Sequence, residues 1–390
     1  MATVGFIVGT NIGAGILALS YSSRNAGYLP LLVCLIITCF MCTITMLYVT
    51  ESCLRTKGNH QLAGLTSRYL GKAVAWLIFF GIAANSYGAL TAYMSGSGKI
   101  LEGFFGEMGL TRTMGSLIFF VPAVGVMYVG LAALGVAQKV ISIGMMAVIT
   151  VLVYATFVDV DTDVANLTAA NWTLVVPIFN LAVFIFGAQF LVPELVRGNL
   201  ETVEKLPKLI ITGMALTLLI VAIVPASIIA LVGLDNLSEV ATTSWGIKLG
   251  SWAFWVANLF ALTAMLTSYW GLGGALFSNI FDHFQLGSET NILRRILVLA
   301  AVAIPPFLFN YFGMGGFVDA LYFAGTFGGV LMGIIPMLLL RRSRASGDQN
   351  PGFVCGWYAH PIIQNIIMAT FIFSAFYEIA AQFGLLPKSW

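Results

Sequence analysis

Gly9-Thr10-Asn11-Ile12-Gly13-Ala14-Gly15 interrupts an apolar stretch that covers residues 2–21. Gly13 and Gly15 lie near its middle, and each glycine weakens a helix by about 1 kcal/mol relative to alanine. Inside a bilayer, opened backbone groups are tolerated only where they line a cavity or meet protein or ligand. The stretch therefore predicts a discontinuous helix whose free N–H and C=O groups bind a substrate and an ion. The alternative is that the small residues only permit close helix packing.

The composition is that of an all-α polytopic membrane protein. The 390 residues are 59% hydrophobic and 9% charged, with a net charge of +2 and a mean hydropathy of +0.95. These values exclude an ordinary soluble domain, and no basic run indicates a nucleic-acid partner. Neither the five cysteines nor the three histidines show metal-ligand spacing. We expect an integral protein of the inner or plasma membrane, with the lipid bilayer as its main partner and no cofactor other than an ion.

Apolar windows of about 20 residues, each long enough to cross a hydrocarbon core of about 30 Å, recur along the chain. No linker or change of composition divides them, so we expect one transmembrane domain over residues 1–390. Two connecting segments, 56–71 and 234–249, are expected to form short helices at the membrane surfaces. We predict eleven spanning segments: 2–22, 28–54, 73–98, 114–134, 137–157, 174–197, 206–232, 251–281, 293–312, 317–340 and 361–383.

The 18 lysines and arginines divide unevenly between the two sides of this arrangement. Cytoplasmic loops carry the excess of basic residues in membrane proteins, which predicts a cytoplasmic N-terminus and an external C-terminus. The inner loops would then hold Arg55, Lys57, Arg68, Lys72, Lys139, Arg197, Lys205, Lys208, Arg294, Arg295, Arg341, Arg342 and Arg344. The outer side would hold only Arg24, Lys99, Arg112, Lys248 and Lys388.

A second weak point follows about 174 residues after the first, at Phe186-Gly187-Ala188-Gln189-Phe190, with Pro193 beyond it. A kink at Pro193 would explain one break but not the correspondence between two. Five spans separate the two weak points, so the halves that contain them have opposite orientations. Two interrupted helices in corresponding positions of an inverted repeat indicate the binding site of a transporter. The repeats would cover about residues 1–157 and 174–340, followed by one extra helix at 361–383.

The first motif, continued to Leu19, resembles the first-helix signature of the tyrosine/tryptophan permease branch of the amino acid/polyamine/cation superfamily. The resemblance continues in Ala92-Tyr93-Met94-Ser95-Gly96-Ser97-Gly98, in Phe186-Gly187 with Val192-Pro193, and in Thr267-Ser268. It implies the leucine-transporter-type fold. That fold has five-plus-five inverted helices around a central site, broken first and sixth helices, and here one additional C-terminal helix.

The resemblance implies a secondary active symporter that imports a neutral amino acid, aromatic by preference, through alternating access. The half-helix beginning near Gly15 offers free N–H groups to the carboxylate of such a substrate, and backbone carbonyls near Ala14, Phe186 and Gly187 suit its ammonium. The middle of the first segment contains no arginine or acidic residue, which argues for a neutral substrate.

The pocket for the substrate side chain would be lined by segments one, three, six, eight and ten. Tyr87 corresponds to a tyrosine of the aromatic permeases, whereas Gln189 stands where those permeases tend to carry histidine. Gln189 either hydrogen-bonds an indole or phenol or satisfies backbone groups in the broken helix. This difference keeps an aliphatic or small neutral amino acid open as an alternative substrate. The expected binding residues are Gly13, Ala14, Gly15, Asn85, Tyr87, Phe186, Gly187, Ala188, Gln189, Tyr269 and Tyr322.

The resemblance also implies a Na⁺ site between segments one and eight. Ala264-Met265-Leu266-Thr267-Ser268 matches its spacing, because two hydroxyls and a carbonyl one helical turn apart can converge on one hard cation. The carbonyls of Gly9 and Ile12 would complete it. Alternatively, Thr267 and Ser268 only bond to their own helix. Proton-coupled relatives place a segment-five lysine in this space, where the present chain has Gly144.

Other functional classes fit the sequence less well. Proton-coupled symport or exchange remains the alternative mechanism, with Glu194 as a possible acceptor if it does not simply pair with Arg197. Glu378 lies outside the repeats and is interpreted as structural or as part of a subunit contact. A passive channel would need polar residues repeated along several helices, and no catalytic constellation of an enzyme can be assembled. The sequence assigns no oligomeric state.

Overall fold

The computed structural model describes residues 2–13, 15–58, 60–129, 134–287 and 291–388, and the regular elements in these ranges are helices. Nine described helical segments are long and apolar enough to cross a membrane, and a bent pair at the N-terminus makes a tenth. The nine contain α3 (Tyr28–Leu54), α5 (Lys72–Phe105), α6 (Arg112–Val129), α8 (Val175–Ile185) with α9 (Val192–Arg197), α10 (Leu206–Val232), α12 (Ser251–His283), α13 (Ile292–Tyr311), α14 (Phe317–Ala324) with α15 (Val330–Ser346), and α16 (Pro361–Gln382).

The remaining expected segment, 137–157, coincides with α7 (Leu134–Val158). Its described apolar part, Gly144–Val158, is shorter than the others. At 1.5 Å per residue that part covers only about 22 Å, less than a hydrocarbon core. The structure therefore gives nine to ten apolar spans among the described residues, and the eleven-span arrangement stays a prediction.

Both predicted helix breaks are present. The first span consists of α1 (Ala2–Asn11) and α2 (Gly15–Ser22), which meet at an angle of 47°. The second predicted break separates α8 from α9, with the short 3₁₀ turn η5 (Ala188–Leu191) between them. Ala14 lies outside the described residues.

A third interruption, which the sequence did not predict, lies between α14 and α15. Residues Gly325–Gly329 form the π-helical turn η8. A Cβ on Gly325 would collide with the Asn180 carbonyl of α8, and one on Gly328 would collide with the Asn85 side chain of α5. Glycine is therefore required here because two neighbouring helices approach the backbone directly. π-Helical turns often occur at functional sites.

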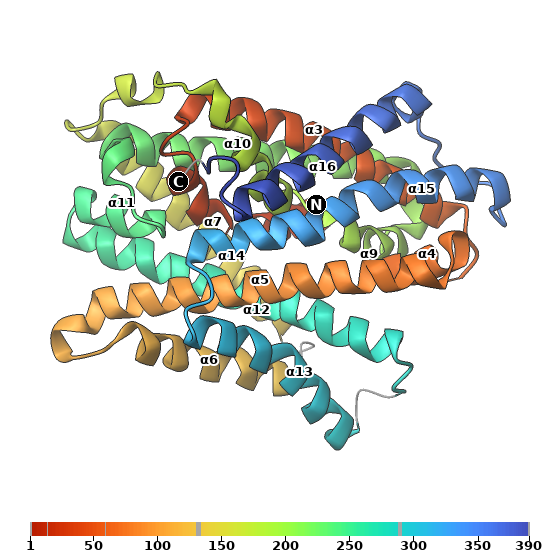
Figure 1. The fold of residues 1–390 in the computed structure, drawn as a ribbon, viewed down its shortest axis with the longest axis horizontal. Helices are drawn as coiled ribbons and strands as arrows, with labels where there is room; N and C mark the ends of the chain where they lie inside the picture. Colours follow the sequence, from red (N-terminus) through yellow and green to blue (C-terminus); the bar gives the residue numbers. More distant parts are fainter. Residues whose placement is uncertain (1, 14, 59, 130–133, 288–290, 389–390) are drawn as a thin grey trace.

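Both connecting segments contain the short helix that the sequence predicted, and the two helices lie at opposite ends of the molecule (Figure 1). The first is α4 (Leu62–Leu70), and the second is α11 (Ala241–Leu249). Between these ends α5 runs along most of the bundle and packs against α6, α12 and α14, while α3 packs against α10 and α15.

A buried carboxylate holds together the end of the molecule that contains α4. Glu51 of α3 is fully buried and accepts two hydrogen bonds from Arg344 of α15, at 2.8 and 2.9 Å. It also accepts from Arg55 at 2.8 Å and from the Cys355 amide at 2.7 Å. Burial and the nearby Glu51 carboxylate raise the pKa of the Cys355 thiol. On the surface beside it, Arg68 pairs with Asp348 at 2.5 Å.

Ion pairs also join segments at the other end. Lys99, near the end of α5, pairs with Glu239 at 2.5 Å, and Glu239 accepts from the Phe317 amide that opens α14. Lys388, beyond α16, pairs with Asp319 of α14 at 3.1 Å. Thus Lys99 and Lys388, both expected outside, lie with the start of α14, whereas Arg55, Arg68 and Arg344, expected inside, lie at the end that contains α4.

Candidate functional site

The two predicted breaks face each other. A Cβ built on Gly15, the first residue of α2, would come within 2.8 Å of Ile185 Cγ1 and 3.3 Å of Phe184 Cδ1. The start of α2 therefore rests on the last turn of α8, at a distance that only glycine allows. This contact places the unwound residues of the first span beside those of the sixth.

The backbone around this contact offers donors and acceptors at buried positions. Gly15, Ile16 and Leu17 are buried at the N-terminus of α2, where N–H groups lack intrahelical partners and the helix dipole is positive. The Ile16 amide makes only a long bond of 3.3 Å to the Gly13 carbonyl. Opposite them, the Phe186 carbonyl accepts from the Ala188 amide at 2.9 Å. Such a site can bind an anionic group at α2 and a cationic group at the carbonyls.

Segment eight closes a second side of the first break. A Cβ on Gly13 would lie 2.5 Å from Ser268 Oγ of α12, so this hydroxyl touches the break directly. The Thr267 hydroxyl donates to the carbonyls of Thr263 and Ala264, each at 3.1 Å. Thr267 thus makes the bond to its own helix that the sequence left as an alternative, although its oxygen lone pairs remain able to meet a cation. Gly9, in the last turn of α1, and Ile12, just after it, stay predicted ligands.

Several predicted binding residues direct their side chains to neighbouring helices. Asn85 donates to the Ala324 carbonyl of α14 at 3.0 Å, and Tyr87 donates to the Ala301 carbonyl of α13 at 2.8 Å. Gln189 donates to Thr45 of α3 at 3.0 Å. The structure therefore brings Gly13, Gly15, Phe186 and Ser268 together but turns these three side chains to the surrounding bundle.

The remaining predicted residues are buried. Phe186 and Ala188 are fully buried beside Gly187 at the second break. Tyr269 of α12 packs its ring edge against Phe119 of α6, with ring centroids 5.9 Å apart. Tyr322 of α14 is also fully buried.

The interpretation of Gly144 needs correction. The resemblance implied that this residue lies beside the cation site, in the position of a lysine in proton-coupled relatives. In the structure Gly144 is exposed, and nothing lies within 4 Å of the point where its Cβ would be. A side chain at this position would begin in open space on the surface of α7, so its absence does not leave a cage free for sodium.

Two residues near the breaks were missing from the expected site. Tyr93 of α5 is 1% exposed and lies beside Ser268, whose hydroxyl touches Gly13. Asn11 ends α1, is 4% exposed and donates to Met214 Sδ at 3.4 Å, which is a weak acceptor. Tyr93 lies in the segment-three motif Ala92–Gly98 and Asn11 in the motif of the first segment, so their places in these motifs were the available signal.

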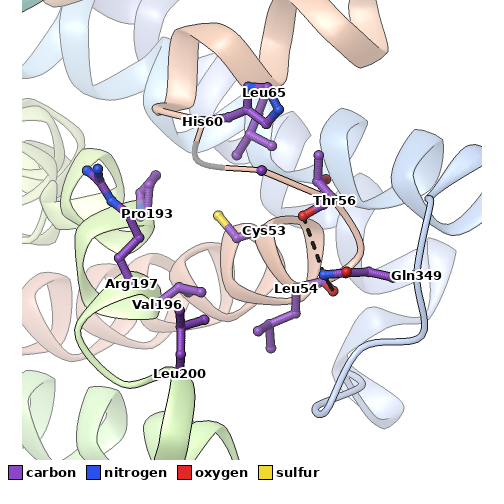
Figure 2. A pocket seen from close by; sticks show the side chains of 11 residues that line it. Cys53, Leu54, Thr56, His60, Leu65, Pro193, Val196, Arg197, Leu200 and Gln349 are labelled. Carbon is purple, nitrogen blue, oxygen red and sulfur yellow. Dashed lines mark hydrogen bonds between the residues drawn. The ribbon is translucent and has the colours of Figure 1, made fainter.

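A cavity of about 180 Å³ lies at the α4 end, between the end of α3 and α9 (Figure 2). Its wall includes Cys53 and Arg197, with Gln349 on the opposite side. Glu194 of α9 pairs with Arg197, as the sequence suggested, and accepts from Gln61 at 2.5 Å. These contacts tie the second half of the broken sixth span to the segment that precedes α4.

A sequence profile of the tryptophan/tyrosine permease family matches residues 1–377. The chain belongs to this family. The permease is 27% identical over 400 residues to the "Tyrosine-specific transport system 1" of Haemophilus influenzae, covering 98% of this chain and 96% of that protein. It is 25% identical to the "Tryptophan-specific transport protein" of the same organism, covering 97% and 94%. It is also 25% identical to the "Tryptophan-specific transport protein" of Shigella flexneri, covering 98% and 95%.

These comparisons and the apolar helices establish the class of the protein. The permease is an integral membrane protein of the cell membrane and a transporter rather than an enzyme. The resemblance to the tyrosine/tryptophan permease branch is confirmed. Membership of the larger superfamily and the leucine-transporter-type fold stay expectations.

Proposed function

We propose that this permease imports a neutral, aromatic amino acid together with Na⁺ by alternating access. The observation that carries the proposal is the contact of Gly15 with Ile185, which joins two broken spans at one buried place. Discontinuous helices in membrane proteins persist where their opened backbone meets a substrate or ion. The names of the relatives favour tyrosine or tryptophan as the substrate.

The substrate would be held mainly by backbone. Its carboxylate would lie at the N–H groups of Gly15 and its neighbours, and its ammonium at carbonyls around Phe186 and Gly187. Tyr93 is the segment-three tyrosine that reaches this region through Ser268. Gln189 donates its hydrogen bond to Thr45. The selectivity of the permease for an aromatic ring would therefore rest on the shape of the binding site rather than on a hydrogen bond from residue 189.

Sodium would lie between the first break and α12. Its ligands would be the hydroxyls of Ser268 and Thr267 and carbonyls of Ala264, Gly9 and Ile12, which are the hard oxygen donors that such cations prefer. The direct contact of Ser268 with Gly13 supports this assignment. Proton coupling is the second candidate, because the exposed position of Gly144 removes one argument for sodium over protons.

We further propose the five-plus-five arrangement, with a cytoplasmic N-terminus and an external C-terminus. The breaks in the first and sixth spans support the repeat, and the separation of Arg55 and Arg344 from Lys99 and Lys388 supports the orientation. A tag after Trp390 should be accessible to impermeant reagents in intact cells. A tag at Gly58 should become accessible only after the membrane is opened, and the reverse result would refute the orientation.

Proteoliposomes decide the function. We expect saturable uptake of labelled tryptophan or tyrosine, driven by an inward Na⁺ gradient, lost when choline replaces sodium, and not inhibited by lysine or glutamate. Uptake that is driven by a pH gradient alone and is unchanged in choline would show that protons, not sodium, are the coupling ion. If small aliphatic amino acids inhibit uptake best, the substrate is aliphatic rather than aromatic. Flux that does not saturate would indicate a channel.

A further inference from the structure

A buried acidic residue lies outside both repeats, in the last helix. Glu378 of α16 is fully buried, although α16 as a whole exposes much apolar surface. α16 packs against α8, η8 and α15. An ionisable side chain inside a membrane-spanning helix is costly to place and is usually tied to function.

Glu378 belongs to a polar cluster that joins three helices. The Tyr322 hydroxyl of α14 interacts with Glu378 and with Asn180 of α8. Asn180 donates to the Ser374 carbonyl of α16 at 3.3 Å. Asn180, Tyr322 and Glu378 are each fully buried. The cluster therefore links the last helix to the first halves of the two interrupted spans that contain α8 and α14.

The cluster lies near the end of the bundle that contains α11. Tyr322 is five residues beyond the start of α14 and Asn180 five beyond the start of α8, which is about 7–8 Å along each helix. Glu378 is four residues before the end of α16. In the proposed orientation this is the external third of the membrane.

Among the residues that the structure describes, few other ionisable groups face Glu378. α14 contributes Tyr322 and, one turn nearer its start, Asp319, which pairs with Lys388. Tyr377 precedes Glu378 on α16, while α8 and η8 carry no charged residue. The arginines of α15 lie toward the opposite end, where Arg341 bonds to Gln364 and Asn365.

The ionised carboxylate costs several kcal/mol in such surroundings, even with hydrogen bonds, and a bound proton removes this cost. The neutral acid can both accept from Tyr322 and donate to an oxygen, so it fits an uncharged cluster of hydroxyl and amide groups. Ionisation of Glu378 would draw in water and weaken the packing of α16 against α8 and α14. Movement of the spans that contain α8 and α14 would then depend on whether Glu378 is protonated.

We propose that Glu378 is a proton-binding residue through which external pH sets how firmly α16 holds α8 and α14, and thereby the rate of transport. This rests on the proposed transport function, and its uptake test also rests on sodium as the driving ion, because a proton-driven carrier responds to external pH directly. Glu378 acts through Tyr322 and Asn180 and is a positioning residue, since nothing places it against the substrate.

The test is the pH profile of Glu378→Gln, which keeps the size of the side chain but cannot ionise. Uptake is measured in proteoliposomes at saturating sodium while only external pH changes. We expect wild-type uptake to fall as external pH rises, and the variant to stay at the acidic limit of the wild type. Glu378→Asp should retain a pH dependence with a shifted midpoint. The control Glu102→Gln, at an exposed residue of α5, should follow the wild type.

A wild-type pH profile in Glu378→Gln would overturn the proposal. If that variant carries no transport, the melting temperature of purified protein without substrate is compared across the same pH range for wild type, Glu378→Gln and Tyr322→Phe. If the melting temperature of Glu378→Gln no longer changes with pH as that of the wild type does, the proposal is supported. If the same change persists in the variant, the proposal is refuted. Because melting needs neither substrate nor sodium, this result stands even if the proposed transport function fails.

Discussion

Ser268 Oγ lies 2.5 Å from the point where a Cβ on Gly13 would be placed. Unbonded heavy atoms do not approach so closely, so α12 and the first helix break are in contact at a position that excludes any side chain. The contact joins the two segments between which the cation site is proposed. It also gives Gly13 a steric role that is separate from the weakening of the helix.

Replacing Gly13 by alanine should therefore separate the break from α12. We expect Gly13→Ala to destabilise the protein by about 1–3 kcal/mol, as overpacking does, and to raise the sodium concentration needed for uptake. Gly5→Ala is the matched control, because nothing lies within 4 Å of that Cβ position on α1. The double variant Gly13→Ala with Ser268→Ala should regain thermal stability but not sodium affinity. Equal behaviour of Gly13→Ala and Gly5→Ala would contradict the contact.

The contact between the two breaks can be tested in the same manner. Gly15→Ala should push α2 away from α8, because its Cβ would lie 2.8 Å from Ile185 Cγ1. We expect a loss of substrate affinity, measured by competition for labelled tryptophan, and a complete loss for Gly15→Val, whose branched side chain is larger and stiffer. Adding Ile185→Ala to Gly15→Ala should recover part of the affinity. If Gly15→Val binds normally, backbone recognition at this place is wrong.

The sequence predicted the breaks because glycine weakens a helix wherever it occurs, irrespective of its neighbours. It missed the η8 turn for the opposite reason. The glycines of Gly325–Gly329 matter because the Asn180 carbonyl and the Asn85 side chain press on them, and these residues are far away in sequence. A requirement imposed by a distant neighbour cannot be recognised without the packing.

The segment-three tyrosines show a second limit. Tyr87 and Tyr93 are six residues apart on α5, so their side chains point about 120° apart around the helix. The sequence shows that both lie on one apolar helix, but the helices that surround α5 decide which one meets the site. Tyr87 donates a hydrogen bond to α13, whereas Tyr93 lies beside Ser268 of α12. The same uncertainty about helix rotation explains why Gly144 was placed at the site and is found on the surface.

The buried carboxylate at the α4 end should matter more for stability than the surface pair beside it. Removing Glu51 takes away the acceptor of the Cys355 amide and both carboxylate bonds of Arg344, which keeps its bond to the Cys355 carbonyl. Breaking a buried pair costs about 3–5 kcal/mol. Arg68→Ala removes only the pair with Asp348, which is partly exposed and contributes about 0–1 kcal/mol. We expect Glu51→Ala to lower the melting temperature strongly and Arg68→Ala to change it little. The opposite order would show that the network around Glu51 does not hold α3 to α15.

The role of Thr267 in sodium binding can be separated from its bond to its own helix. Thr263, one turn earlier on α12, makes the same kind of bond, to the carbonyls of Leu259 and Phe260 at 3.1 and 2.8 Å. Thr263→Ala and Thr267→Ala therefore lose equivalent helix contacts, but only the second would remove an oxygen from the cation. We expect Thr267→Ala to raise the half-saturating sodium concentration while leaving substrate affinity at saturating sodium nearly unchanged, and Thr263→Ala to resemble the wild type.

Coupling between two ligands is reciprocal, so bound substrate also raises the affinity for sodium. This increase should be smaller in Thr267→Ala than in the wild type. If the two variants show the same sodium dependence, the Thr267 hydroxyl serves only its helix and the sodium site must be sought elsewhere.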